Sequence, residues 1–143
     1  MKKDLAALLQ NNPEFDLSIC KILNDKQLES LENNIVLFLH GKTLDMGTKD
    51  LSILLLKELL CSLSQQELLP KTIILSQKTV LCNQRESEFL HFFRLLEQKN
   101  IEILTCKTSA EYYKINKNIP IGHFASMEEI IEKLFHASKI IQW

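Results

Sequence analysis

The stretch Ile101-Glu-Ile-Leu-Thr-Cys-Lys-Thr-Ser-Ala-Glu-Tyr-Tyr113 joins a short apolar run to a polar segment, with Cys106 at the junction. The apolar run predicts a buried strand, and the polar segment predicts a loop and a short helix capped by Thr108 or Ser109. In α/β proteins, ligands and reacting groups lie outside the carboxyl ends of the strands. The N–H groups of a helix start and the neighbouring Lys107 would favour the thiolate form of Cys106. We therefore predict a reactive thiol at this position.

Segments typical of strands and segments typical of helices alternate along the rest of the chain. Five short apolar segments predict strands at residues 35–40, 72–76, 101–104, 119–123 and 139–142. Pro120 removes a ladder hydrogen bond, so it confines the fourth of these to an edge or a strand start. The alternation predicts an α/β fold, with a parallel sheet and helices on both of its faces.

Helix signals fill the gaps between these strands. A long helix begins near residue 48, and its apolar residues lie almost all round it, so we expect much of its surface to be covered. Asn83 opens a capping box for the next helix, and Asn100 would end that helix in a left-handed conformation. Ser126 opens a clearer capping box for the helix before the last strand. Residues 1–33 lack strand character and predict a helical arm ahead of a domain at residues 34–143.

The composition excludes several classes of protein. A chain of 143 residues suits one domain, and 45% hydrophobic and 24% charged residues are ordinary for a globular protein. A net charge of −1 with mixed signs gives no basic footprint for nucleic acid or an anionic membrane. No apolar run approaches the roughly 20 residues that span a bilayer, and polar residues interrupt any signal-peptide core. We predict a cytoplasmic protein with no nucleic-acid or membrane partner.

Cysteine spacing and glycine motifs exclude common cofactor sites. Cys20, Cys61, Cys82 and Cys106 include no CxxC pair, which argues against a zinc ribbon and a dithiol redox motif. A cytosolic location argues against structural disulfides. No GxGxxG or GxxxxGKS/T motif follows a strand, so a nucleotide fingerprint is missing. We predict no metal and no cofactor, and we expect Cys20 and Cys61 to be buried packing residues.

Scattered positions in residues 34–141 follow the order and spacing of one family. They include Gly41-Lys-Thr-Leu-Asp-Met-Gly47, Leu69-Pro-Lys-Thr72 and Ile103-Leu-Thr-Cys106, followed by Tyr112, Gly122 and Met127. The chain resembles the DsrE-like domain at the C-terminal end of YedF proteins, which are linked to selenium metabolism. The resemblance implies a three-layer α/β/α fold with a mostly parallel five-stranded sheet. It also implies a sulfur (or selenium) relay in which Cys106 carries a persulfide, a sulfur-donor or sulfur-acceptor protein as partner, and assembly into a homo-oligomer.

The chain departs from this family at two places beside the predicted site. The family's Cys-Gly-Thr-Cys appears as Cys106-Lys-Thr-Ser109, which excludes a disulfide within the motif. The family's Asn-x-Gly-Val appears as Gln77-Lys-Thr-Val80, and loss of the glycine should change the loop backbone. Two functions therefore stay open: a persulfide carrier, or a non-catalytic module that binds a small ligand or a protein.

The predicted site residues gather at the carboxyl edge of the sheet. Cys106 is the candidate catalytic residue, and the alternative is an inert cysteine at a strand end. His40 and His123 end the first and fourth predicted strands, so either would be placed to pair with the thiol, as nucleophilic catalysis requires. The candidate binding residues are Lys107, Thr108, Ser109, Gln77 and Gly47, and the possible accessory residues are Cys82, His40 and His123.

Overall fold

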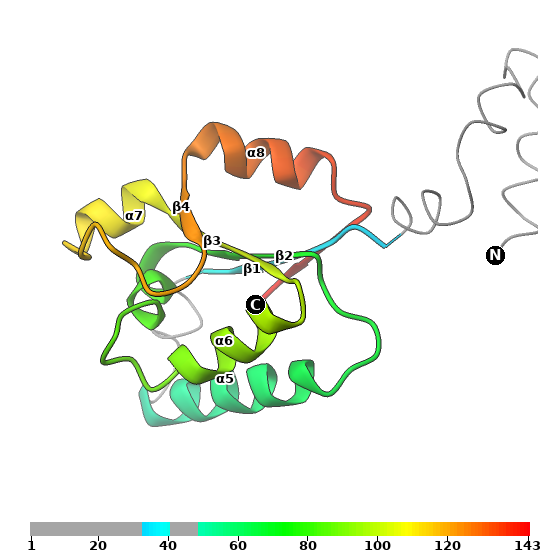
Figure 1. The fold of residues 1–143 in the computed structure, drawn as a ribbon, viewed down its shortest axis with the longest axis horizontal. Helices are drawn as coiled ribbons and strands as arrows, with labels where there is room; N and C mark the ends of the chain where they lie inside the picture. The colour runs from blue at the N-terminus through cyan, green and yellow to red at the C-terminus, as the bar shows by residue number, and fades with distance from the viewer. Residues whose placement is uncertain (1–32, 41–48) are drawn as a thin grey trace, which may run out of the picture. The chain divides into compact units, whose positions relative to one another are not determined.

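The computed structural model describes residues 33–40 and 49–143. Its five strands form one sheet in the order β4-β3-β2-β1-β5, and every neighbouring pair is parallel (Figure 1). The strands are β1 (Ile35–Leu39), β2 (Thr72–Leu75), β3 (Glu102–Cys106), β4 (His123–Ala125) and β5 (Lys139–Gln142). The predicted α/β class is confirmed, and the sheet is fully parallel. Nearly all of the predicted arm (residues 1–32), as well as Cys20 and Gly47, lies outside the described residues.

Helices lie on both faces of the sheet and complete three layers (Figure 1). α5 (Lys49–Ser64) and α6 (Leu90–Gln98) lie on one face, while α7 (Lys107–Tyr112) and α8 (Met127–Phe135) lie on the other. A short 3-10 helix, η1 (Gln77–Cys82), follows β2. In the part of the chain that the structure describes, no helix combines the length and the apolar character needed to cross a bilayer.

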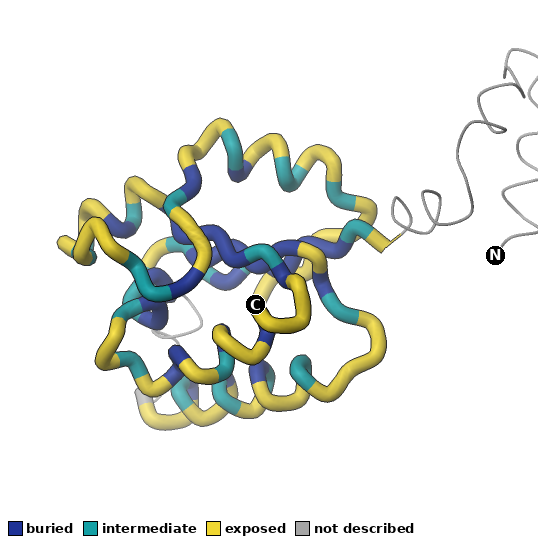
Figure 2. The backbone as a smooth tube through the Cα atoms, in the orientation of Figure 1, coloured by how far each residue is buried: buried dark blue, intermediate teal, exposed yellow. Residues whose placement is uncertain are grey.

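The core lies along the three central strands, which are dark blue in Figure 2. All four residues of β2 are buried, whereas all four residues of the edge strand β5 are exposed. α5 turns its fully buried Leu56 and Leu60 towards the core. Its Leu51 and Leu54 are each 52% exposed, and Cys61 on the same helix is exposed. Part of the helix is therefore covered and part is open, and the expectation of a buried Cys61 is wrong.

The connection between β2 and α6 differs from the prediction. Asn83 ends η1 instead of starting a helix, and α6 begins only at Leu90. The Asn83 amide Nδ2 donates to Thr105 Oγ1 (3.0 Å) and to the Ile121 carbonyl (2.8 Å). These two bonds hold the Asn83 amide against β3, and Oδ1, the atom that would cap a helix, accepts no bond from the described part of the chain. The prediction failed because both partners are distant in sequence.

The fourth strand is also displaced from its predicted place. The sequence predicts a strand at residues 119–123 that ends at His123. In the structure, β4 begins at His123. Gly122 has a φ of +61°, and a Cβ atom there would lie 1.9 Å from the Ile103 carbonyl oxygen. The backbone therefore approaches β3 too closely for any other residue, and the ladder starts only after this glycine. The prediction that His123 ends the strand is wrong.

Two predicted helix boundaries are confirmed and one is wrong. Asn100 follows α6 with a φ of 63°, and Ser126 Oγ accepts the Glu129 N–H at 3.2 Å as the N-cap of α8. Cys106 itself is the N-cap residue of α7, so Thr108 and Ser109 lie inside that helix and do not cap it.

Candidate functional site

Cys106 lies at the end of β3 and immediately before α7, as the sequence predicts. Glu102 of the same strand reaches Lys133 on α8 (Oε2 to Nζ, 2.6 Å), so its side chain is on the α7 and α8 face. Side chains alternate along a strand, which places Cys106 on that face as well. The residue is only 2% exposed. Reactive thiols are at least partly accessible, so this burial argues against chemistry at Cys106 in the folded state.

Ser109 and Gln77 are two predicted binding residues that the structure brings together. The Ser109 Oγ accepts the Gln77 N–H at 2.9 Å. Gln77 has a φ of 54°, a left-handed conformation that costs a residue with a side chain roughly 1–2 kcal/mol. The hydroxyl at position 109 therefore anchors a strained loop residue. Lys107 and Thr108, on the same helix, are exposed.

Thr79 occupies the position at which the resembled family has glycine, and it is fully buried. Its Oγ1 donates to the Leu39 carbonyl (2.9 Å) or to the Ser76 carbonyl (2.7 Å), and it accepts the Ser76 N–H (3.0 Å). The threonine hydroxyl thus ties the end of β2 to the end of β1. Sequence reasoning noticed the missing glycine but not this replacement contact, although a threonine in a loop after a strand is a usual sign of a local backbone bond.

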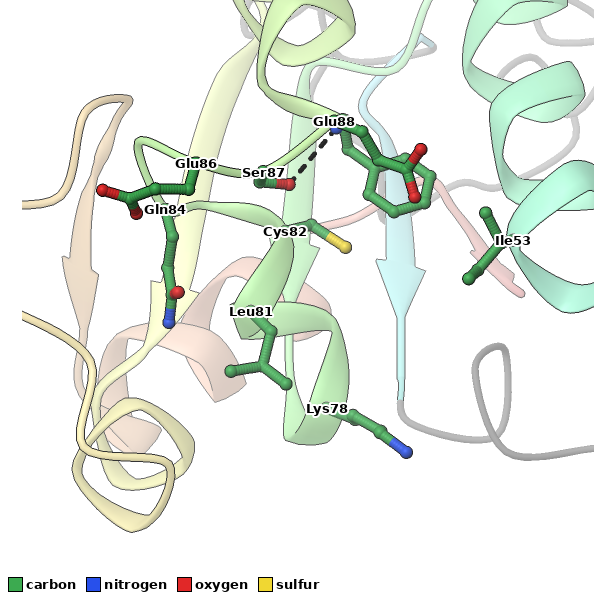
Figure 3. A pocket seen from close by; sticks show the side chains of 9 residues that line it. Ile53, Lys78, Leu81, Cys82, Gln84, Glu86, Ser87 and Glu88 are labelled. Atoms are coloured by element: carbon green, nitrogen blue, oxygen red, sulfur yellow. Dashed lines mark hydrogen bonds between the residues drawn. The ribbon is translucent and has the colours of Figure 1, made fainter. Parts of the chain in front are cut away.

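Cys82 lies on the opposite face of the sheet from Cys106. It lines a cavity of about 430 Å³ that also includes Ile53 of α5, and Figure 3 shows its sulfur between η1 and that helix. Burial, helped by the nearby Glu88 carboxylate, raises the pKa of the Cys82 thiol to about 12. The thiol is therefore neutral at physiological pH and points away from Cys106. An accessory role for Cys82 at Cys106 has no support in this arrangement.

Neither predicted histidine is placed to activate Cys106. Parallel register pairs Cys106 with Ala125, so His123 lies two residues nearer the amino edge of the sheet. Its Nε2 is 2.9 Å from Glu129 Oε1. His40 follows β1, and β2 separates β1 from β3, which puts the two strands roughly 10 Å apart. The His40 ring lies instead beside the Phe38 ring, with 6.0 Å between their centroids.

Comparison with solved structures decides the type of fold. The structure of the ychN protein from E. coli superposes with a TM-score of 0.56, covering 78% of this chain and 99% of that chain, at 19% sequence identity. This chain has a DsrE-like fold. No family model and no curated protein matches the sequence, so the finer resemblance to YedF proteins stays a prediction. The shared fold at this identity assigns no site residue, so the site is argued from its geometry alone.

The DsrE-like domain has a cluster of polar side chains at the amino edge of its sheet. The ligand atoms of Glu102, His123 and Glu129 all lie within 4.8 Å of one another. However, Lys133 Nζ is 2.6 Å from Glu102 Oε2, and Thr72 Oγ1 donates to the same oxygen at 3.1 Å. A cation would have to displace this ammonium group. The cluster is therefore explained as a network that joins α8 to β3, and we assign no metal to it.

At the other edge of the DsrE-like domain, a cavity of about 560 Å³ lies beside α7. Its lining includes Lys107, Lys114 and Lys117 together with the apolar side chains of Ile115 and Phe124. Lys107 belongs to the predicted site, whereas its neighbour Cys106 does not line this cavity. The accessible chemistry of the site is thus cationic and apolar, and the buried thiol takes no part in it.

Proposed function

We propose that this chain is a non-catalytic binding module with a DsrE-like fold, whose cavity beside α7 holds a small ligand. The burial of Cys106 carries the proposal, because a sulfur donor must reach the Sγ atom and the residue is 2% exposed. The adjacent Lys107 is exposed and lines the cavity of about 560 Å³. Among the two functions that the sequence leaves open, binding without thiol chemistry is therefore the better supported.

The use of Ser109 supports the same proposal. At this position the resembled family has a second cysteine, which would serve redox or relay chemistry. Here the hydroxyl accepts the Gln77 N–H at 2.9 Å and holds the loop after β2. A hydroxyl is a much better acceptor than a thiol, which suits anchoring. Residue 109 thus makes a structural hydrogen bond in this chain, where a second cysteine would serve redox or relay chemistry.

The second candidate is the predicted sulfur carrier, with a persulfide on Cys106 and a sulfur-donor or sulfur-acceptor protein as partner. The position of Cys106 favours it, because the residue ends β3 and is the N-cap of α7. Under this candidate, the first turn of α7 must move before a donor reaches the sulfur. Local opening of a buried segment requires free energy, and the binding module needs no such opening.

Intact-mass analysis after incubation with polysulfide separates the two candidates. The protein would carry Cys20→Ser, because that residue lies outside the described structure. Cys61 is exposed and serves as an internal positive control, and Cys61→Ser and Cys106→Ser variants assign any change. We expect a gain of about 32 Da, one sulfur atom on a thiol, at Cys61 and none at Cys106. A gain on Cys106 that Cys106→Ser abolishes and Cys61→Ser leaves intact would establish the sulfur carrier.

We also propose that the chain forms a homo-oligomer. α8 exposes Met127 (52%), Ile131 (44%) and Phe135 (84%), which lie on neighbouring turns of one helix. Apolar side chains that recur at helical spacing on a surface are typical of a protein interface. Light scattering should give a mass above that of the 16.6 kDa chain, and a monomer at micromolar concentration would contradict the proposal.

A further inference from the structure

Two cavities beside α7 share a wall. The cavity of about 560 Å³ and a second one of about 170 Å³ are both lined by Lys114 and Ile115. We propose that they form one groove, the α7 groove, which binds a small organic anion. This inference rests on the proposed function, because it names the class of ligand for the same site.

The charge of the groove favours an anion. Lys107, Lys114 and Lys117 line the larger cavity, and Arg85 lines the smaller one. Only two carboxylates, on other lining residues, oppose these four cations, although the whole chain has a net charge of −1. Within residues 33–40 and 49–143, none of the four takes part in an ion pair. A bound carboxylate would therefore meet cations that form no ion pair within the described residues.

The apolar part of the lining indicates that the anion is organic. Ile115, Phe124 and Ala110 line the larger cavity along with the lysines. Ile115 and Phe124 are half-buried, so their exposed surface is available to a ring or an alkyl chain. Inorganic phosphate would leave this surface in water, whereas a ligand with an apolar body would cover it.

Lys114 occupies a position where lysine is unusual. It lies just after α7 with a φ of 54°, and its N–H donates to the Glu111 carbonyl at 3.1 Å. Glycine is the usual residue at such a left-handed helix end. Lys114→Gly would therefore relieve backbone strain while it removes the cation shared by both cavities. The variant offers a test in which loss of binding cannot be attributed to loss of folding.

The test uses benzoate, which combines a carboxylate with an apolar ring. Benzamide keeps the ring and lacks the charge, and acetate keeps the charge and lacks the ring, so they are matched probes. Saturable shifts of backbone amide signals would be followed by NMR on the full chain. We expect benzoate to bind about tenfold more tightly than either matched probe, because each lacks one of the two features that the lining complements.

Variants show whether the site is the α7 groove. Lys114→Gly should weaken benzoate binding about tenfold. Asn100→Gly changes another left-handed residue, with a φ of 63°, that does not line the groove, and it should leave the binding unchanged. Absence of saturable binding, equal affinity for the three probes, or no effect of Lys114→Gly would overturn the inference. None of these results measures the transfer of sulfur to Cys106. Failure of this inference is therefore distinguishable from failure of the proposed function, which the polysulfide experiment tests.

Discussion

The hydrogen bond between Ser109 and Gln77 predicts a measurable loss of stability on substitution. Ser109→Ala removes the Oγ that accepts the Gln77 N–H at 2.9 Å. A hydrogen bond of this kind contributes about 1 kcal/mol, and the left-handed Gln77 depends on it for its position. Alanine also favours a helix over serine by roughly 0.5 kcal/mol, which offsets part of the loss. The net destabilisation expected for Ser109→Ala alone is therefore about 0.5 kcal/mol.

Thr108→Ala is the matched control for this prediction. Thr108 is the preceding residue of α7 and is exposed, so its replacement gains a similar helix propensity without loss of the loop contact. The two variants should differ by about 1 kcal/mol, with Thr108→Ala the more stable. Urea unfolding monitored by circular dichroism measures this difference as a shift in midpoint at constant slope. Equal midpoints for the two variants would refute the anchoring role of Ser109.

Three further substitutions have defined outcomes. Gly122→Ala should lose at least about 3 kcal/mol in urea unfolding, because its Cβ would meet the Ile103 carbonyl oxygen at 1.9 Å in a left-handed backbone; a loss below about 1 kcal/mol would contradict this. Burial raises the pKa of Cys82 to about 12 in the folded state. The contribution of the neutral thiol to the free energy of unfolding is therefore complete below about pH 9 and is lost as pH rises towards 12. Between about pH 8 and pH 10 the free energy of unfolding should fall by about 1 kcal/mol more than in Cys82→Ala, and parallel pH profiles would argue against a buried thiol. Asn83→Ala should cost about 2 kcal/mol, because it leaves Thr105 Oγ1 and the Ile121 carbonyl without their donor; an unchanged melting temperature would show that these bonds are dispensable.

Local signals predicted much of the fold correctly because the physics there is local. The Ser126 N-cap and the left-handed Asn100 involve atoms within one helical turn of each other, although the Glu129 side chain contacts His123 and does not complete the predicted capping box. Apolar runs placed β1 and β2 to within one residue, since strands buried in a parallel sheet need continuous apolar residues. The alternation of strands and helices then predicted a parallel sheet with helices on both faces, and the resemblance to a known family implied the DsrE-like form.

Errors arose where distant residues decide the local structure. Asn83 resembles a helix cap in sequence, but its amide bonds to residues 22 and 38 positions away. Residues 119–123 resemble a strand, yet the close approach of Gly122 to Ile103 shifts the ladder to His123. The burial of Cys106 was missed for the same reason: the depth of a strand end depends on how the following helix packs over it, which the local sequence does not determine.

The most direct test of the central claim is the alkylation rate of Cys106 in the native protein. With Cys20 replaced by serine, iodoacetamide labelling would be followed by peptide mass mapping, and Cys61 provides the reference for an exposed thiol. Because a buried thiol reacts only through local opening, Cys106 should react roughly a hundredfold more slowly than Cys61 and equally fast in concentrated urea. Labelling of native Cys106 as fast as that of Cys61, or faster, would contradict the binding-module function and favour the sulfur carrier.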